Sequence, residues 1–254
     1  MSLIDSQIHV AIKSYKRAGM VRTLAAAPFA WVWVPESQEA DYRHYYGDRV
    51  RTIPDAADGN LCRKSNAILD RSPCPWTLIL DDDISRIGCW EDGKRIVLDA
   101  DALAEVVEHC FLLAADLGVH LWGINQNKDP LIYQPSHPFA LLAPILGPFN
   151  GHLEPILRYD ESVLGKDDYD FWLQNIRKYH KTLRFNRYHY EHDHGNMAGG
   201  FVSMRTLDVE QRGVARLRQK WGTRVFRPGG TKGGRSATGK NILNSKITIP
   251  IAGC

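Results

Sequence analysis

Three consecutive carboxylates, Asp81, Asp82 and Asp83, offer the clearest chemistry in this sequence of 254 residues. They follow the apolar run 76–80, which predicts a buried strand, so they should stand at its carboxyl end. Adjacent ionised carboxylates repel one another and need a cation where water is partly excluded. Oxygen ligands favour Mg²⁺ or Mn²⁺, which complete their coordination with water and substrate phosphate. The alternative is a solvated turn with an Asp as helix cap.

Alternation along an extended stretch would place Asp81 and Asp83 on one side and Asp82 on the other. A second group of acids, Asp167, Asp168 and Asp170, opens a predicted helix. Acids in a first helical turn are favoured by the helix dipole, and that alone can explain them. The functional interpretation is that one of them is a general base for a substrate hydroxyl.

Histidines recur at 189, 192 and 194 in a polar segment. Imidazole binds first-row metals, and this spacing on an extended strand would present His192 and His194 to one ion. No Cys accompanies them, so a structural zinc site is not expected. Exposed histidines on an edge strand would give the same pattern.

Polar residues also follow the first predicted strand. Ser14 can cap the next helix, Tyr15 can stack on a base, and Lys16 or Arg17 can meet phosphate. An ordinary polar loop would look alike.

Arg63 and Asn66 are three residues apart and therefore share one face of a predicted helix. Taken alone, this pair is a weak indication of a binding site.

Alternating apolar runs and helical patterns must position these residues. The predicted strands are 8–12, 31–35, 49–53, 76–80, 119–124 and 139–146; the predicted helices are 20–27, 36–46, 59–72, 99–118, 167–183 and 207–221. Strands separated by helices of this length predict an α/β fold, with an open, mixed and mostly parallel sheet flanked by helices. Ligands bind such sheets outside the carboxyl ends of the strands. We expect a single domain over 1–254, with halves 1–98 and 99–254.

Composition excludes several classes. The most hydrophobic stretch, 138–149, is interrupted by prolines, so no membrane span is expected. The N-terminus lacks a secretory pattern, and the five cysteines form no CxxC pair, which together predict a cytoplasmic protein with reduced thiols.

Charge is divided unevenly along the chain. All 29 acidic residues lie at or before Glu210, whereas 211–254 carries ten of the 32 Lys and Arg. Such a segment calls for an anionic neighbour: nucleic acid, phosphate or an acidic face of its own domain. It contains a basic helix and then a Gly-rich, cationic loop at 228–240.

In order and content, these motifs resemble the nucleotide-sugar glycosyltransferases of the GT-A type: SYKR after the first strand, a GNLCRKSN helix, a strand running into DDD, and a later GKDDYDF. More narrowly, YDESVLGKDDYDFWLQNIRKYHKTLRFNRY (159–188) is similar to the segment that marks bacteriophage TET-associated glycosyltransferases. Those enzymes are thought to decorate hydroxymethylated pyrimidines in phage DNA.

The resemblance implies a metal-dependent, inverting transferase that uses Mn²⁺ or Mg²⁺ and a nucleoside-diphosphate sugar, a UDP-sugar in the first place. Carried over, it makes Asp81 a ribose or metal contact and Asp83 a metal ligand, lines the nucleotide with Ser14, Tyr15, Arg17, Arg63 and Asn66, and gives the base role to Asp168. The family often has Glu where this chain has Asp167, which leaves either acid as the base. The family's later histidine matches His194 best and His192 next.

The same resemblance suggests DNA with hydroxymethylated pyrimidines as the partner, and no membrane. Lys232 and Arg235 of the Gly-rich loop would then bind the donor diphosphate, and Arg212, Arg216 and Lys220 would bind DNA. Two rivals remain: a GT-A transferase with a saccharide, lipid or protein acceptor, and a non-catalytic nucleic-acid-binding module. The motifs leave the oligomeric state open.

Overall fold

The computed structural model describes residues 2–126, 133–192, 206–227 and 246–247. The strands are β1 (Ile8–Lys13), β2 (Trp31–Pro35), β3 (Val50–Ile53), β4 (Trp76–Asp81), β5 (Ile84–Glu91), β6 (Lys94–Val97), β7 (Leu121–Asn125), β8 (Phe139–Ala140), β9 (Phe149–Leu153), β10 (Leu183–His192), β11 (Phe226–Arg227) and β12 (Lys246–Ile247). The α-helices are α1 (Thr23–Ala26), α2 (Glu39–Tyr46), α3 (Leu61–Arg71), α4 (Ala100–Asp116), α5 (Asp167–Tyr179) and α6 (Leu207–Trp221).

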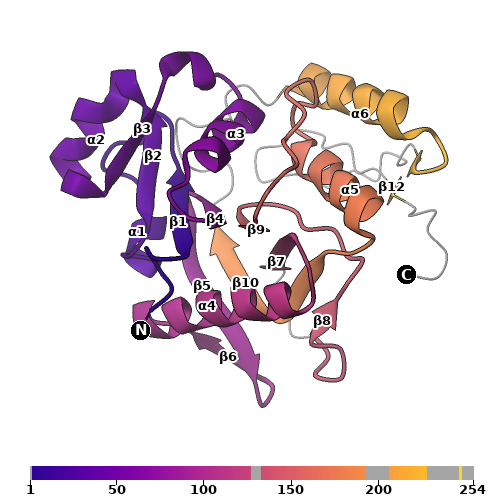
Figure 1. Cartoon of the computed structure of the whole chain (residues 1–254), viewed down its shortest axis with the longest axis horizontal. Coiled ribbons are helices and arrows are strands. Elements are labelled where there is room, and N and C mark those ends of the chain that lie inside the picture. Colours follow the sequence, from indigo (N-terminus) through magenta and orange to yellow (C-terminus); the bar gives the residue numbers. More distant parts are fainter. Residues whose placement is uncertain (1, 127–132, 193–205, 228–245, 248–254) are drawn as a thin grey trace.

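One sheet organises the molecule, in the order β3-β2-β1-β4-β9-β7-β10-β5-β6, with β8 paired to β10 (Figure 1). Parallel pairing joins β3, β2, β1 and β4, and joins β7 to β10; the other pairs of this sheet are antiparallel. The α/β class and the mixed sheet flanked by helices are therefore confirmed, but the sheet is not mostly parallel, because four of its described strand pairs are parallel and five are antiparallel.

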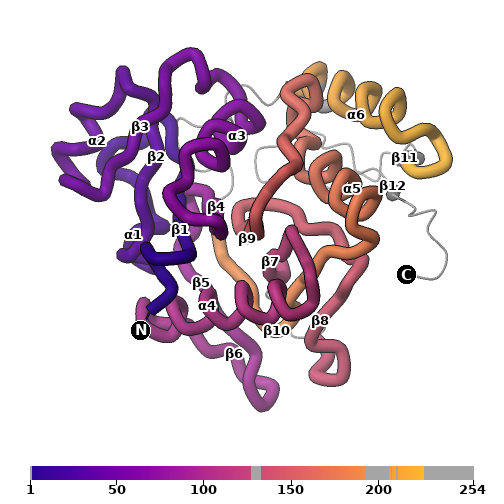
Figure 2. Tube along the Cα trace, viewed as in Figure 1, coloured from indigo at the N-terminus to yellow at the C-terminus, as the bar shows by residue number. Residues whose placement is uncertain are grey.

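Helices cover both faces of the sheet because the central strands are buried on both sides. Ile8, Val10 and Ile12 of β1 pack into one core with α4, whereas Ala11 faces a second core with α3 and α5. Figures 1 and 2 show α6 beside α5 at the far side of the molecule from α2. The carboxyl ends of β1 to β4 thus open toward the segment that leads into α5.

Two predicted elements are shorter in the structure, and four strands were not predicted. The expected strand 139–146 shrinks to the two residues of β8, since Pro144 supplies no N–H for a ladder. The predicted helix 167–183 ends at Tyr179, where His180 adopts a left-handed conformation with φ of 63°. β5, β6, β9 and β10 were not predicted as strands.

β5 and β6 precede residue 98 but pair toward β10, at the opposite end of the sheet from β3. The expected division into halves 1–98 and 99–254 stays a prediction.

Three further predictions concern membrane spans, the cysteines and the Gly-rich loop. None of the helices within the described ranges is long and apolar enough to cross a membrane. Cys62, Cys74, Cys89 and Cys110 are free and buried. The Gly-rich loop 228–240 lies outside the described residues.

Candidate active site

The three carboxylates occupy a tight turn between β4 and β5, and Asp82 is the one that faces the β1 loop. Its buried carboxylate accepts hydrogen bonds from Ser14 Oγ and from Arg17 Nη1. Thr23 Oγ1 fixes the backbone of the same turn by donating to the Asp81 carbonyl oxygen at 2.6 Å. Only Asp81 belongs to the extended strand, because Asp82 and Asp83 form the turn itself.

Asp81 ends β4 directly beside the end of β1. Lys13 is its register partner, and Lys13 Nζ lies 3.0 Å from Asp81 Oδ1. Burial works against the charge of Lys13, but Asp81 and Asp167 more than compensate and raise its pKa. Lys13, which no sequence motif indicated, is therefore held between the carboxylate turn and the start of α5.

At Asp83, the nearby positive charge of Arg17 does not outweigh the cost of burying the carboxylate. The Asp83 side chain is buried, and its Oδ1 has no hydrogen-bond partner among the described residues. Burial, followed by the charges of Asp81 and Asp82, raises its pKa to about 7.

The turn therefore has an excess of negative charge and a buried oxygen without a partner, which is the donor set that a hard divalent cation accepts. Asp81 and Asp83 fit this role. No group of three His, Cys, Asp or Glu within the described ranges is arranged to hold a metal ion. Remaining ligands would have to be water, substrate phosphate or residues outside those ranges.

The first residues of α5 bring a second pair of carboxylates to this place. Burial and then the charge of Asp168 raise the pKa of Asp167 to about 7, while Lys13 opposes the shift and Asp81 adds to it. Asp168 accepts hydrogen bonds from the backbone N–H groups of Gly147 at 3.3 Å and Tyr169 at 2.8 Å. The two predicted acid motifs, far apart in sequence, are thus electrostatic neighbours.

Tyr190 on β10 is a third contributor that sequence reasoning missed. Its pKa is raised first by burial and then by Asp81, Asp168 and Asp83, so its hydroxyl lies among the acids. A Cβ at Gly147 would lie 2.5 Å from Tyr190 Oη, which leaves only glycine at that position. The alternation of polar and aromatic residues over 184–192 was the available signal of a strand.

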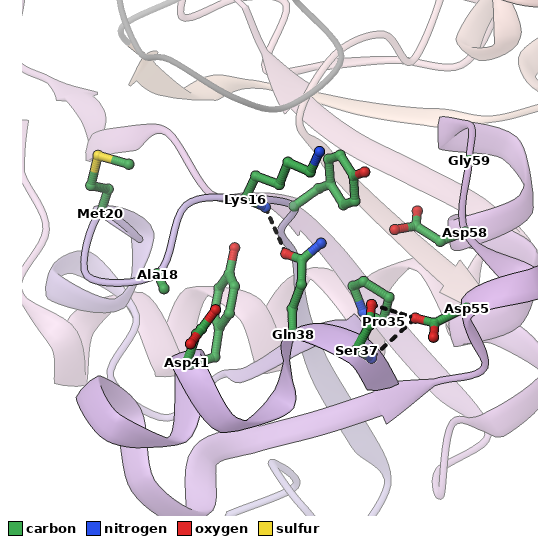
Figure 3. Close-up of a pocket in the computed structure, with 12 residues that line it drawn as sticks. Lys16, Ala18, Met20, Pro35, Ser37, Gln38, Asp41, Asp55, Asp58 and Gly59 are labelled. Atoms are coloured by element: carbon green, nitrogen blue, oxygen red, sulfur yellow. Dashed lines mark hydrogen bonds between the residues drawn. The ribbon is translucent and has the colours of Figure 1, made fainter.

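A pocket of about 670 Å³ opens beside the turn, at the carboxyl ends of β1, β2 and β3 (Figure 3). It is lined by Tyr15, Lys16, Ala18, Met20, Pro35, Ser37, Gln38, Asp41, Tyr42, Asp55, Asp58 and Gly59. Gln38 Oε1 accepts from the Lys16 backbone N–H at 2.8 Å, which closes part of its wall.

Of the predicted nucleotide-binding residues, Tyr15 lines this pocket, whereas Ser14 and Arg17 are buried against Asp82. Lys64, which was not predicted as a site residue, contacts the segment that follows β1. Its buried Nζ donates to the Ser14 carbonyl at 2.6 Å and lies 5.3 Å from the Tyr15 ring centre.

Arg63 and Asn66 do share a helical face, but in the described chain both bind the segment before α5. Arg63 Nε donates to Glu161 at 2.9 Å, and Asn66 exchanges two hydrogen bonds with the backbone of Tyr159. Their predicted contact with the nucleotide stays a prediction, and their present contacts are structural.

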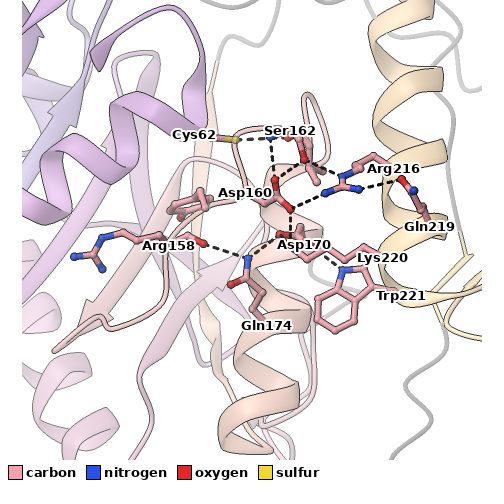
Figure 4. A network of polar contacts seen from close by, with 12 residues as sticks. Cys62, Arg158, Asp160, Ser162, Asp170, Gln174, Arg216, Gln219, Lys220 and Trp221 are labelled. Atoms are coloured by element: carbon pink, nitrogen blue, oxygen red, sulfur yellow. Dashed lines mark hydrogen bonds and ion pairs between the residues drawn. The ribbon is translucent and has the colours of Figure 1, made fainter. Parts of the chain in front are cut away.

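The predicted contact of the α6 cations with DNA likewise stays a prediction, and two of these cations contact the protein itself. Arg216 Nε donates to Ser162, and Lys220 Nζ contacts Asp160 and Asp170, so both side chains are directed at their own chain (Figure 4). Arg212 is exposed and pairs with Asp208, one turn earlier on the same helix. Among the described residues, Arg212 is the one of these three cations that contacts no segment outside its own helix.

Three predicted residues, His194, Lys232 and Arg235, lie outside the described residues. His192 is the last residue of β10, with its ring centre 5.5 Å from that of Tyr190.

Comparison with solved structures identifies the fold as that of the GT-A glycosyltransferases. A mycobacterial protein matches 96% of this chain and 87% of its own, with a TM-score of 0.52 at 13% identity. Glucosyl-3-phosphoglycerate synthase from Mycobacterium tuberculosis, in complex with Mn²⁺, UDP-glucose and phosphoglyceric acid, matches 90% of this chain and 85% of its own, with a TM-score of 0.54 at 10% identity.

The same synthase with Mg²⁺ and UDP matches 97% of this chain and 88% of its own, with a TM-score of 0.52 at 10% identity. No family model matches the sequence. No curated protein matches it either. At such low identities the likeness establishes the fold and leaves the activity to be argued from the site.

Proposed function

We propose that this protein is a metal-dependent glycosyltransferase that takes a sugar from a nucleoside-diphosphate sugar. The observation that carries the proposal is the meeting of the 81–83 turn with Asp167 and Asp168, beside a pocket at the carboxyl ends of β1 to β3. Open α/β sheets bind their ligands at this edge. The synthase structures that share this fold are complexes with Mn²⁺ or Mg²⁺ and a uridine diphosphate ligand.

Asp81 and Asp83 would hold the cation, with His194 or His192 as a further ligand. When bound, Mn²⁺ or Mg²⁺ supplies a Lewis acid for the charge that develops on the leaving diphosphate. The pocket would take the nucleoside, with Tyr15 against the base, and a UDP-sugar is the expected donor. Lys232 and Arg235 are proposed to approach the diphosphate.

The acids that open α5 would serve the acceptor. An acceptor hydroxyl oxygen attacks the anomeric carbon as the bond from that carbon to the diphosphate oxygen breaks, and the hydroxyl proton passes to a carboxylate. Asp168 is the proposed base and Asp167 its rival, and attack from the face opposite the diphosphate gives inversion. A base of this kind contributes about 10²- to 10⁴-fold in rate.

The pH dependence of kcat separates the two acids. Asp168→Asn and Asp167→Asn are compared with the wild type for turnover of UDP-glucose with Mn²⁺. The base variant loses the acidic limb of the profile together with its activity, whereas the other variant keeps the limb. Full activity and an unchanged profile in both variants would contradict this assignment.

The proposed acceptor is a hydroxymethylated pyrimidine in DNA. The support is the similarity of 159–188 to phage TET-associated glycosyltransferases, together with the absence of acids from 211–254. A screen of nucleotide sugars against hydroxymethylated DNA with Mn²⁺, read by mass spectrometry of the nucleosides, tests it. Absence of transfer to DNA from every donor refutes this half of the proposal.

A saccharide, lipid or protein acceptor is the second candidate, favoured by the contacts that Arg216 and Lys220 make with the protein itself. Binding to DNA through phosphates weakens as salt rises, with a log–log slope of about −0.9 per phosphate, whereas this alternative predicts no such slope. A non-catalytic nucleic-acid-binding module is the third. Calorimetry with Mn²⁺ and UDP excludes it if both bind.

A further inference from the structure

The segment that leads into α5 is fixed at both ends by one side chain. Lys220 Nζ, on α6, lies 2.8 Å from Asp160 Oδ2 and 2.8 Å from Asp170 Oδ2 (Figure 4). Asp160 and Asp170 flank the stretch that carries Asp167 and Asp168. A single ammonium group therefore holds Asp160 and Asp170 close together, at the two ends of the segment that carries Asp167 and Asp168.

Asp170 is fully buried, and its carboxyl oxygens are surrounded by hydrogen-bond donors. Asp170 Oδ1 accepts from Trp221 Nε1 at 2.7 Å, and Oδ2 accepts from Gln174 Nε2 at 2.7 Å as well as from Lys220. A buried charge with these partners is costly to displace, since each lost bond leaves an unpaired polar atom. Asp170 thereby fixes the first turn of α5, and with it Asp167, one turn earlier.

The α6 backbone also approaches the segment directly. A Cβ on Gly213 would lie 2.3 Å from the Leu164 carbonyl oxygen, so the contact requires glycine. Glycine inside a helix costs about 1 kcal/mol relative to alanine, which suggests that the close approach is what keeps it there. Val214 and Leu217 of α6 bury Val163 of the segment in a small apolar cluster.

The opposite side of the segment rests on α3. Asn66 binds both backbone groups of Tyr159, and Cys62 Sγ lies 3.5 Å from the Val163 carbonyl oxygen. Residues 159–170 are thus held between α3 and α6.

We infer that Lys220 is a positioning residue, which acts through Asp160 and Asp170 to place the candidate base in line with the donor. The inference rests on the proposed function and gives Lys220 a role other than DNA contact. Misplacement of a reacting group by about 1 Å can cost about 100-fold in rate. Loss of the clamp should therefore lower turnover and leave donor binding intact.

Lys220→Met, Lys220→Arg and Asp160→Ala are compared with the wild type in the full-length protein. Asp160→Ala breaks one arm of the clamp without leaving Asp170 unpaired, and it serves if Lys220→Met fails to fold. Arg177→Met is the matched control, because Arg177 is an exposed cation in the last turn of α5 to which no binding or catalytic role is assigned. The readouts are hydrogen exchange over 159–170, the Kd for UDP with Mn²⁺, and kcat and KM for UDP-glucose.

In Lys220→Met we expect exchange over 159–170 to rise about tenfold or more and kcat to fall about 10- to 100-fold, with Kd and KM within about twofold of the wild type. Lys220→Arg should recover most of kcat, Asp160→Ala should show a smaller loss, and Arg177→Met should match the wild type. Unchanged exchange in Lys220→Met, or faster exchange with unchanged kcat, would overturn the inference, as would an equal loss in Arg177→Met. If the wild type turns over no nucleotide sugar, the proposed function fails, and exchange alone then decides whether Lys220 orders the segment.

Discussion

Two acidic clusters of this protein differ in the partners of their carboxylates. The first is the 81–83 turn, and the second is formed by Asp160 and Asp170, which share Lys220. In the 81–83 turn, Asp82 is paired but Asp83 keeps a buried oxygen without a partner among the described residues, and burial raises its pKa to about 7. At the second cluster, burial works to raise the pKa of Asp160, but hydrogen bonds from Lys220 and Ser162 outweigh it and hold that pKa at about 2. A cluster that keeps a buried carboxylate oxygen without a partner, as at Asp83, indicates a binding site. A cluster whose carboxylates are all paired indicates a structural role.

The largest effect should come from Asp83→Asn. Removing the proposed cation ligand should reduce turnover of a nucleotide sugar by about 1000-fold or more, which is the loss of roughly 4 kcal/mol of transition-state stabilisation. An activity assay with UDP-glucose and Mn²⁺ measures this, and near-normal activity would contradict the role of the turn.

The same variant should also be more stable than the wild type. A carboxyl whose folded pKa lies above its unfolded value imposes a cost on folding, which grows as pH rises from the unfolded pKa to about 7 and is complete above that pH. Asp83→Asn removes that penalty, so its gain in unfolding free energy should be present at pH 8 and shrink toward pH 5. Urea denaturation at both pH values tests this, and a destabilised variant at pH 8 would contradict it.

Asp170→Ala should change stability in the opposite direction. It removes the buried acceptor for Trp221 and half of the Lys220 clamp, for an expected loss of about 3 kcal/mol. Urea denaturation at pH 7 measures it. If this variant were as stable as the wild type, the second cluster would not have the structural role inferred from its paired carboxylates.

Affinity for Mn²⁺ should fall with pH because the cation competes with a proton at the turn. With the Asp83 pKa raised to about 7, the apparent affinity should drop about tenfold per pH unit below 7 and level off above it. Calorimetric titration from pH 5.5 to 8 checks this. A flat profile would show that another group binds the ion.

The smallest effect concerns DNA. Arg212→Ala should lower the slope of log affinity against log salt for hydroxymethylated DNA by about one, while Lys220→Met should leave that slope unchanged. Binding measured across a salt series separates the two cations. Equal changes in both variants would contradict the division of roles between Arg212 and Lys220.

The sequence predicted the part of the fold in which hydrophobic periodicity is strong. β1 to β4 and α3 to α5 lie close to the predicted ranges, since parallel strands buried on both faces read as continuous apolar runs. β9 was missed because Phe149–Leu153 contains Asn150, Gly151 and His152, whose burial comes from antiparallel partners on both sides. β10 was missed for a related reason, because its polar residues gave no apolar run.

For the site, the sequence by itself determined which acids stand at the end of β4 and at the start of α5, since both follow from local pattern. Only the tertiary structure decided what those acids meet. Lys13 and Tyr190 approach these acids from other strands. Lys220, which the sequence predicted as a DNA contact, binds Asp170 of its own chain. Residue type and spacing fix a side chain's chemistry, but its partners depend on contacts between segments distant in sequence, which only the folded chain brings together.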